Sequence, residues 1–169
     1  GQTVALQDYI SRMPEKQKKI YYITAENVNA AQSSPQLEVF KKNNIEVLLL
    51  VDRIDEWVIS HLPEFEGKAL QSVAKGDLSL DEIMQNDQEK EQEKQKETEQ
   101  QESFNVLLEK IKETLGETIQ DVRLSHRLTV SPACLVRDQN AMGPQLERLL
   151  KAAGQSITET KPIFELNLF

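Results

Sequence analysis

Few residues in this sequence have the type and spacing that acid–base or metal chemistry needs. The two histidines lie far apart: His61 is predicted on the apolar side of a helix as a packing residue, and His126 in a loop as a hydrogen-bonding residue. Cys134 stands inside an apolar run typical of a strand, which indicates a buried, unreactive thiol. No Cys/His cluster has metal-ligand spacing. The sequence therefore predicts no catalytic residue, no metal ligand and no cofactor-binding residue.

Acidic side chains follow two predicted strands, at Thr24–Glu26 and at Asp52–Asp55. Ligands of open parallel sheets bind at the carboxyl ends of the strands, so one interpretation is a small α/β enzyme or nucleotide-binding domain with its site there. Capping of the helices that follow explains the same carboxylates more simply. Neither loop carries a glycine-rich phosphate-binding motif, which argues against a nucleotide.

The elements that would position these side chains alternate in the first half of the chain. An unbroken apolar run at Val47–Val51 predicts a strand covered on both faces, as in a parallel sheet. Ser34 can cap a helix that begins at Pro35. The alternation favours a parallel sheet with right-handed crossovers. The predicted elements are a strand at Ile20–Thr24, helical residues over Ala25–Asn43, the strand at Val47–Val51, a helix at Ile54–Leu62 and a strand at Leu70–Val73.

The second half opens with charged residues. Asn86–Glu102 consists almost entirely of Glu, Gln, Lys and Asp, and apolar residues then recur at helical period over Phe104–Leu115. The charged stretch fits either a disordered linker or a solvated helix, and the pattern favours one long helix with an exposed first part, closed by Gly116. Further predicted elements are strands at Val122–Leu124, Ala133–Val136 and Ile163–Leu166 and a helix at Gly143–Ala153.

These elements predict an α/β fold class, α+β overall, with two domains. Residues 1–78 would form a small α/β/α subdomain around a parallel sheet. Residues 79–169 would add a long helix and a small mixed α+β domain.

Composition narrows the possible partners. The 169 residues carry 20 Lys plus Arg against 28 Asp plus Glu, a net charge of −8. A chain this acidic is a poor match for nucleic acid or for an anionic membrane surface. No apolar run is long enough to cross a bilayer, the N-terminus shows no secretory signal, and the single cysteine fits a reducing, cytoplasmic compartment.

Two amphipathic helices carry the apolar side chains that could contact a partner. Trp57 lies at the margin of the first stripe, so its indole either borders the core or offers an apolar contact surface. The second stripe either packs on the small sheet or forms an adhesive helix. If both stripes are buried, the chain is only a connector. The first stripe comprises Ile54, Val58, His61 and Leu62, with Ser60 beyond Trp57, and the second comprises Met142, Leu146, Leu149, Leu150 and Ala153.

Segments along almost the whole sequence resemble the ninety-kilodalton heat-shock chaperone family, and its bacterial members most. Their order and spacing are too specific for coincidence. The segments are Leu6–Met13, Lys19–Thr24, Ser33–Pro35, Ile45–Trp57, Asp121–Leu128 with Ser131–Val136, and Lys151–Gln155.

The resemblance implies that residues 1–78 form the last α/β subdomain of the family's middle domain, and residues 79–169 the beginning of its C-terminal dimerisation domain, without the final dimer helices. Such chaperones are cytoplasmic, ATP-driven homodimers of the stress response that bind partly folded client proteins. Their ATP and magnesium bind in an N-terminal domain outside this chain, so the resemblance implies no nucleotide hydrolysis here. The missing helices would leave the homodimer interface of this chain incomplete.

The resemblance also assigns a role to the two stripes. In the family, clients contact the tryptophan-bearing helix and an amphipathic helix of the C-terminal domain, and this favours partial exposure of both stripes. Matched residue by residue, the client-binding positions are Trp57, Ser60, Met142, Leu146, Leu149 and Leu150.

Two features depart from the family's pattern. Gly143-Pro144 stands where the family has an ordinary helix start. Because proline fits only the first turn of a helix, Met142 is expected in the loop before it. The ending Leu168-Phe169 differs from the family's usual continuation, and nothing in the sequence explains it.

Overall fold

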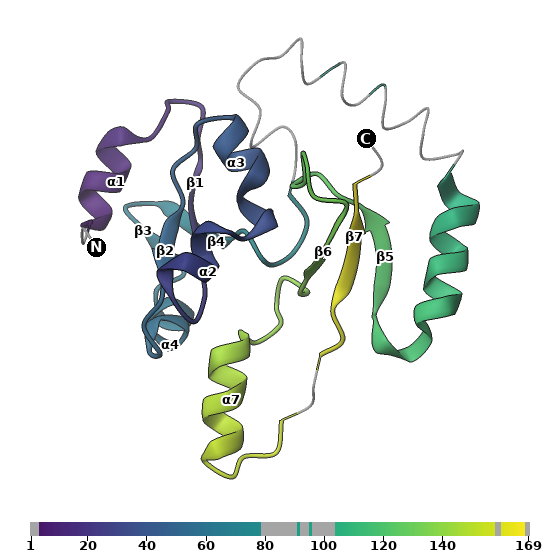
Figure 1. Cartoon of the computed structure of the whole chain (residues 1–169). Coiled ribbons are helices and arrows are strands. Elements are labelled where there is room, and N and C mark those ends of the chain that lie inside the picture. Colours follow the sequence, from purple (N-terminus) through teal and green to yellow (C-terminus); the bar gives the residue numbers. More distant parts are fainter. Residues whose placement is uncertain (1–3, 79–90, 92–94, 96–103, 158–159, 168–169) are drawn as a thin grey trace.

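Two small β-sheets, each with its own helices, form the described part of the chain (Figure 1). The structure is a computed structural model, and it describes residues 4–78, 91, 95, 104–157 and 160–167. We call residues 4–78 the first module, and residues 104–157 with 160–167 the second module. The expected domain boundary between residues 78 and 79 falls at the edge of the described part and stays a prediction.

The central strand of the first sheet is β1 (Lys19–Thr24), whose middle residues are all buried. It pairs in parallel with β2 (Leu48–Leu50) on one side and with β4 (Lys68–Ser72) on the other. A two-residue strand that the sequence pattern did not predict, β3 (Glu64–Phe65), adds an antiparallel edge next to β4. The strand order is β2-β1-β4-β3.

The expectation that Val47–Val51 is covered on both faces is wrong. Its five residues are only half-buried, and the strand itself is limited to β2. The reason is its position in the sheet, because β2 is an edge strand with a single neighbour and part of its surface stays open. The predicted parallel pairing is confirmed.

Short helices complete the first module. Helix α1 (Leu6–Arg12), which the sequence pattern did not predict, is anchored by the buried Tyr9, whose hydroxyl donates to the carbonyl of Glu46 at 2.7 Å. The predicted helical residues divide into α2 (Val28–Gln32), η1 (Pro35–Leu37) and α3 (Glu38–Lys42). The predicted cap is confirmed, since Ser34 Oγ accepts the backbone N–H of Gln36 at 3.3 Å.

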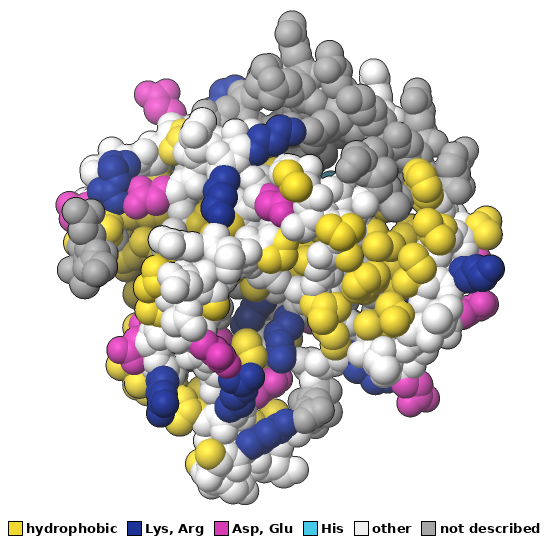
Figure 2. All heavy atoms as spheres, viewed as in Figure 1, with side chains coloured by type: hydrophobic (Ala, Val, Ile, Leu, Met, Phe, Trp, Pro, Cys, Tyr) yellow, Lys and Arg dark blue, Asp and Glu magenta, His cyan; other side chains and the backbone are white. Residues whose placement is uncertain are grey.

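The second module follows the predicted order closely. Strand β7 (Ile163–Leu166) lies between β5 (Asp121–Leu124), to which it is parallel, and β6 (Ala133–Val136), to which it is antiparallel. A helix over residues 104–115 and the 3₁₀ turn η2 (Gly116–Thr118) precede β5, and Gly116 has the left-handed φ of +51° expected of a helix-ending glycine. Figure 2 shows apolar side chains gathered over this side of the molecule.

The remaining helices are α4 (Asp55–His61) in the first module and α7 (Pro144–Ala152) in the second. Of the charged stretch Asn86–Glu102, only Glu91 and Gln95 are described, both as helical, so the predicted long helix lies largely outside the described residues. None of the described helices is long and apolar enough to span a bilayer.

The apolar stripe of α4 does not form a core face, which corrects the expectation for His61. Ile54, Val58 and His61 are all exposed, and the buried residue of this helix is Glu56. The helix is turned so that this carboxylate faces the rest of the protein. Glu56 accepts the hydroxyl of Thr24 and the backbone N–H of Leu146, and the apolar stripe is left facing solvent.

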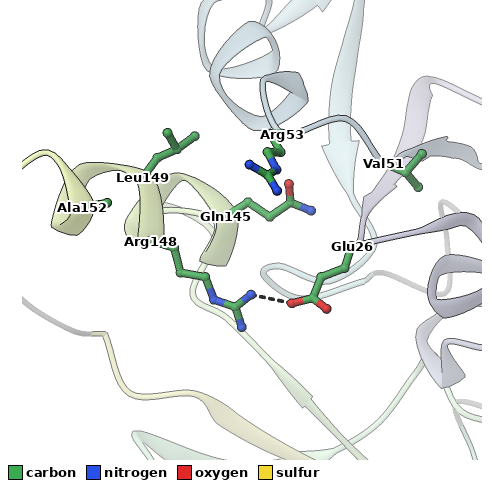
Figure 3. A pocket seen from close by; sticks show the side chains of 7 residues that line it. All are labelled: Glu26, Val51, Arg53, Gln145, Arg148, Leu149 and Ala152. Carbon is green, nitrogen blue, oxygen red and sulfur yellow. Dashed lines mark hydrogen bonds and ion pairs between the residues drawn. The ribbon is translucent and has the colours of Figure 1, made fainter.

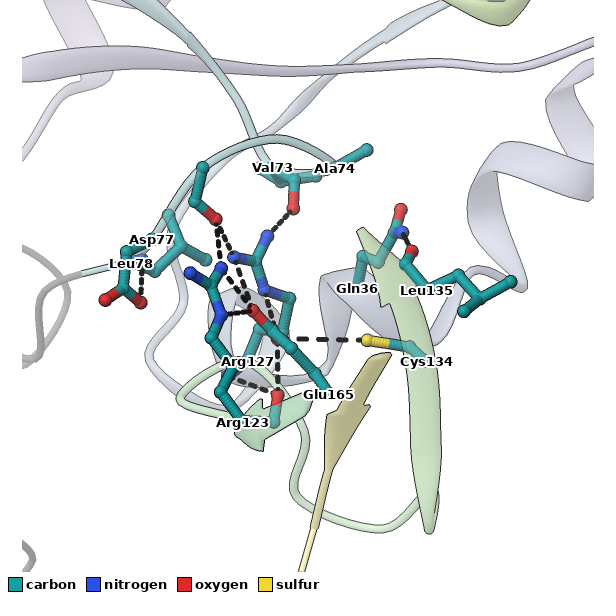
Figure 4. A network of polar contacts seen from close by, with 12 residues as sticks. Gln36, Val73, Ala74, Asp77, Leu78, Arg123, Arg127, Cys134, Leu135 and Glu165 are labelled. Atoms are coloured by element: carbon teal, nitrogen blue, oxygen red, sulfur yellow. Dashed lines mark hydrogen bonds and ion pairs between the residues drawn. The ribbon is translucent and has the colours of Figure 1, made fainter. Parts of the chain in front are cut away.

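A buried network of polar groups joins the two modules (Figure 4). Arg127 is fully buried, and its Nε lies 2.7 Å from Oε2 of the equally buried Glu165. Its other nitrogens donate to the backbone carbonyls of Val73 and Gly76 in the first module. Backbone hydrogen bonds between Ala74, Gly76 and Arg137 continue the contact at 2.8–3.0 Å. We call this region the junction.

The junction includes a second carboxylate, Glu38 at the start of α3. It accepts the backbone N–H groups of Thr129, Val130 and Ser131 at 2.7–3.2 Å, as well as the Ser131 hydroxyl. Burial alone would raise the pKa of Glu38, but these hydrogen bonds favour the ionised form and lower the pKa to about 2. A side chain of the first module thus fixes a loop of the second.

Candidate functional site

Helix α4 presents apolar side chains to solvent. Trp57 is 55% exposed, Ile54 59% and Val58 40%. The Trp57 ring is held from one side by the ring of His61, at a centroid distance of 4.6 Å, and Ser60 Oγ donates to the Trp57 carbonyl at 2.6 Å. The indole is therefore positioned by its own helix while its outer surface remains available to a partner.

Helix α7 is amphipathic and only partly covered. Leu149 is 46% exposed, whereas Met142, Leu146 and Leu150 are half-buried. Met142 lies in the loop before the helix, as its position before Gly143-Pro144 predicted. The alternative in which both stripes are buried is wrong for Trp57 and Leu149, which it required to be nearly inaccessible.

Glu56 connects the two helices, which are in contact with each other. Its Oε2 accepts the backbone N–H of Leu146 in the first turn of α7 at 2.7 Å, and its Oε1 accepts the hydroxyl of Thr24 at 2.9 Å. A carboxylate at a helix N-terminus satisfies an unpaired N–H group and interacts favourably with the helix dipole. The side chain next to Trp57 therefore acts as the cap of the helix that carries Leu149.

Sequence reasoning missed Glu56, although one signal for it was present. The N-cap position of α7 is Gly143, which has no side chain to accept a hydrogen bond, so the cap has to come from elsewhere in the protein. Glycine is also required by space, because a Cβ at this position would lie 2.3 Å from the Glu56 carboxyl carbon. The absence of a local cap could have directed attention to a distant carboxylate.

Further polar contacts fix α7 against the first module. Gln145 Nε2 donates to the carbonyl of Ala25 at 2.7 Å, and Arg148 forms an ion pair with Glu26. Lys75, whose pKa is lowered by burial, donates to the Ala141 carbonyl at 2.6 Å just before the helix. The two modules are thus joined at α7 as well as at the junction.

An open cleft of about 480 Å³ lies where α7 meets the carboxyl ends of β1 and β2 (Figure 3). Glu26, Val51 and Arg53 line it from the first module, and α7 contributes the opposite wall with Leu149 and its neighbours. Among the six residues expected to contact clients, Leu149 is the one that lines this cleft. We use the term cleft for this space alone.

The acidic residues at the strand ends form turn and ion-pair contacts. Asp55 Oδ2 accepts the backbone N–H of Asp52 at 2.8 Å, and Asp52 Oδ1 accepts that of Ile54 at 3.4 Å. The expectation that these carboxylates cap the following helices is wrong, because the N-cap residue of α4 is Ile54, which makes no side-chain cap hydrogen bond, and α2 is capped by Asn27. No group of three or more His, Cys, Asp or Glu side chains within the described ranges could hold a metal ion.

Cys134 occupies the buried position that the sequence predicted. It is 8% exposed, and burial together with the nearby Glu165 carboxylate raises its pKa to about 12. A thiol with this pKa stays protonated near neutral pH, and the protonated form is a poor nucleophile.

The sequence matches a known protein family over almost its whole length. The model of the family described as Hsp90 protein matches residues 1–167. Proteins named Chaperone protein HtpG are 55% identical over 170 residues in Nitrosospira multiformis, 57% over 166 residues in Nitrosococcus oceani and 53% over 166 residues in Coxiella burnetii. Each alignment covers 98% of this chain but 25% of the relative, so the chain spans about a quarter of the length of the curated relatives it matches.

Proposed function

Because this chain belongs to the Hsp90 protein family, we propose that it is the client-contacting part of a molecular chaperone that binds unfolded or partly folded proteins. The observation that carries the proposal is the exposure of Trp57 and Leu149 on two helices that touch each other. Exposed apolar side chains suit a protein that has to accept many different sequences.

The proposal assigns the six expected residues to one surface with two parts. Trp57 and Ser60 of α4 form the first part, and the second part consists of Met142, Leu146, Leu149 and Leu150 at α7. Glu56 sets the spacing between the parts by capping α7 from α4. Residues 1–78 then correspond to the end of a middle domain, and residues 79–169 to the beginning of a dimerisation domain.

The longer protein would work in the cytoplasm. Its ATP and magnesium would bind in a domain outside this chain, and its homodimer would need further helices. This chain would contribute client contacts and transmit motion between domains through the junction. Catalysis would not be its role.

A titration with an unfolded model protein tests the proposal. A fluorescein-labelled, permanently unfolded protein is added to the chain while Trp57 emission and amide exchange of α4 and α7 are followed. We expect both helices to respond, and we expect Trp57→Ala and Leu149→Ser each to weaken binding about tenfold, the usual cost of truncating a central apolar contact.

The matched control is Val130→Ser, because Val130 is also apolar and is 84% exposed but lies in a loop away from α4 and α7. Protection that appears elsewhere but not at α4 and α7 would overturn the assignment.

The alternative, a nucleotide site at the strand ends, is supported by the position of the cleft beside Glu26 and Val51. Calorimetry with ATP decides between the two. Measurable affinity that is lost in Asp52→Asn would favour the nucleotide site, and the client proposal expects no such affinity.

A further inference from the structure

The cleft contains two guanidinium groups in different electrostatic situations. Arg148 is already paired with the carboxylate of Glu26, and Figure 3 shows it turned toward that residue. Arg53 also lines the cleft, and it has no carboxylate within ion-pair distance among the residues that the structure describes. Figure 3 shows its guanidinium near Gln145, between Leu149 and Val51, with no interaction drawn to any of them. The cleft therefore offers one unpaired cation.

The walls beside Arg53 are apolar. Val51 lies on the side of the first module, and Leu149 and Ala152 lie on the side of α7. A volume of about 480 Å³ falls within the usual range of ligand sites and suits a few residues of an extended chain. The cleft thus combines an apolar contact with a single charged donor, which is the composition that fixes the orientation of a bound segment.

The net negative charge of the chain is not spread evenly. Residues 81–102 carry nine Asp or Glu and three Lys, which is six of the eight net negative charges, and Figure 2 shows Lys and Arg as well as Asp and Glu side chains around the part of the molecule where α7 begins. Arginine presents several donors in a planar arrangement that matches a carboxylate bidentately. An acidic side chain entering the cleft would therefore gain a charged hydrogen-bond donor in Arg53.

From these observations we propose that the cleft binds an extended segment of a client in which an Asp or Glu side chain adjoins an apolar residue. Arg53 receives the carboxylate, and Leu149 with Val51 receives the apolar side chain. This inference rests on the proposed function and deepens it by naming the chemistry of the bound segment. Glu26 competes with the client carboxylate for Arg148, so it limits the affinity of the cleft.

Peptide binding to the 169-residue chain tests the inference. Two fluorescein-labelled peptides are used that differ only in Glu or Gln beside a central Leu, with amidated C-termini so that no terminal carboxylate is present. Fluorescence anisotropy is expected to give about threefold to fivefold tighter binding of the Glu peptide, the range of a partly exposed ion pair. High salt should remove the difference because both charges are open to solvent.

Variants separate the roles of the individual charges. Arg53→Gln is expected to abolish the preference, so that the two peptides bind with equal affinity. Glu26→Gln should increase the preference by freeing Arg148. The matched control is Arg12→Gln. Arg12 lies at the end of α1 and forms a surface ion pair with Glu46, so this variant removes the same charge far from the cleft and should leave the preference as it is.

The failure of this inference is distinguishable from the failure of the proposed function. Equal affinities for the two peptides, with both affinities reduced by Leu149→Ser, would overturn the acidic preference and keep the apolar contact. No binding of either peptide, or binding insensitive to Leu149→Ser, would overturn the cleft as the place of binding, and failure of the unfolded protein to protect α4 and α7 would overturn the proposed function itself. A preference for Glu that persists in Arg53→Gln would overturn the role of Arg53.

Discussion

The junction and the cleft both lie between the two modules, but they differ in how completely their polar groups are paired. In the junction, Arg127 and Glu165 are buried and bind each other, backbone carbonyls of the first module and side chains of the second module. In the cleft, Arg53 has no carboxylate partner among the residues that the structure describes, and the apolar side chain of Leu149 is 46% exposed. The charges of the junction are thus engaged within the chain, whereas the cleft retains a charged group for a ligand.

This difference indicates how the chain can leave apolar surface exposed and still hold a defined arrangement. Buried ionic groups without full pairing are costly, so the junction is constrained to a narrow range of geometries. Exposed side chains around the cleft contribute little to folding and are free to serve binding. The stability of the arrangement and its adhesiveness are therefore assigned to different residues.

The contrast between the junction and the cleft would fail if Arg127 could be replaced without a loss of stability. Arg127→Met leaves Glu165 partly unpaired, deprives the Val73 carbonyl of its donor and removes one of the two donors of the Gly76 carbonyl. Removing one partner of a buried ion pair costs about 3–5 kcal/mol, so we expect a loss of that size in the free energy of unfolding in urea. Arg123→Met serves as comparison, because Arg123 binds the same Glu165 and Gly76 but its side chain is 27% exposed, and it should cost markedly less. Equal losses would mean that burial does not set the strength of the junction.

Glu38 gives the stability of the junction a pH dependence. Its folded pKa of about 2 lies below the value near 4.3 of an unfolded chain, so its contribution is fully present above about pH 4.5 and is lost as the pH falls toward 2. Since the carboxylate is partly open to solvent, we expect Glu38→Gln to lower the free energy of unfolding at pH 7 by on the order of 2 kcal/mol. The difference from the unsubstituted chain should shrink over that acid range in urea titrations.

The control for this pH dependence is Glu46→Gln. Glu46 pairs with Arg12 at the surface, with both side chains at least 40% exposed, so its loss should leave the free energy of unfolding almost unchanged. A difference for Glu38→Gln that stays constant between pH 7 and pH 3 would contradict the assignment of the acid sensitivity to this carboxylate.

The sequence predicted the strands far better than the groups that lock them together. Local apolar patterns placed β6 and β7 at their observed residues and gave the cap at Ser34, because these features depend on neighbours in the chain. The edge position of β2 was missed, since a strand's place in a sheet depends on pairings between distant residues.

The candidate site was predicted in its apolar part and missed in its polar part. Trp57 and Leu149 were expected at the surface, and they are exposed. Glu56, Glu38 and Arg53 gave no signal strong enough to single them out, because their partners lie in the other module or are absent. Charged residues of a helix surface look alike in a sequence until the tertiary structure shows which of them face inward.

Between the two regions lies the contact of Glu56 with α7, and its loss should have an intermediate effect. Glu56→Ala removes the cap of Leu146 N–H and should cost about 1–2 kcal/mol in urea unfolding. Gly143→Ser alone should also destabilise the chain, because its Cβ would collide with the Glu56 carboxylate. In the double variant the serine has the space and can cap the helix itself, so stability should recover. Additive losses would show that Glu56 is not the cap of α7.

The smallest effect on folding is expected at the exposed side chains, and this is what separates the cleft and its surroundings from the junction. Ile54 is 59% exposed, so Ile54→Ser should change the free energy of unfolding by less than about 0.5 kcal/mol. If α4 belongs to a contact surface, the same change should still weaken the binding of an unfolded model protein measurably, since an apolar side chain at an interface acts by losing water there. This result would show that Ile54 contributes to binding and not to the packing of its own chain. Loss of stability without loss of binding would instead show that Ile54 stabilises the fold and does not contact the partner.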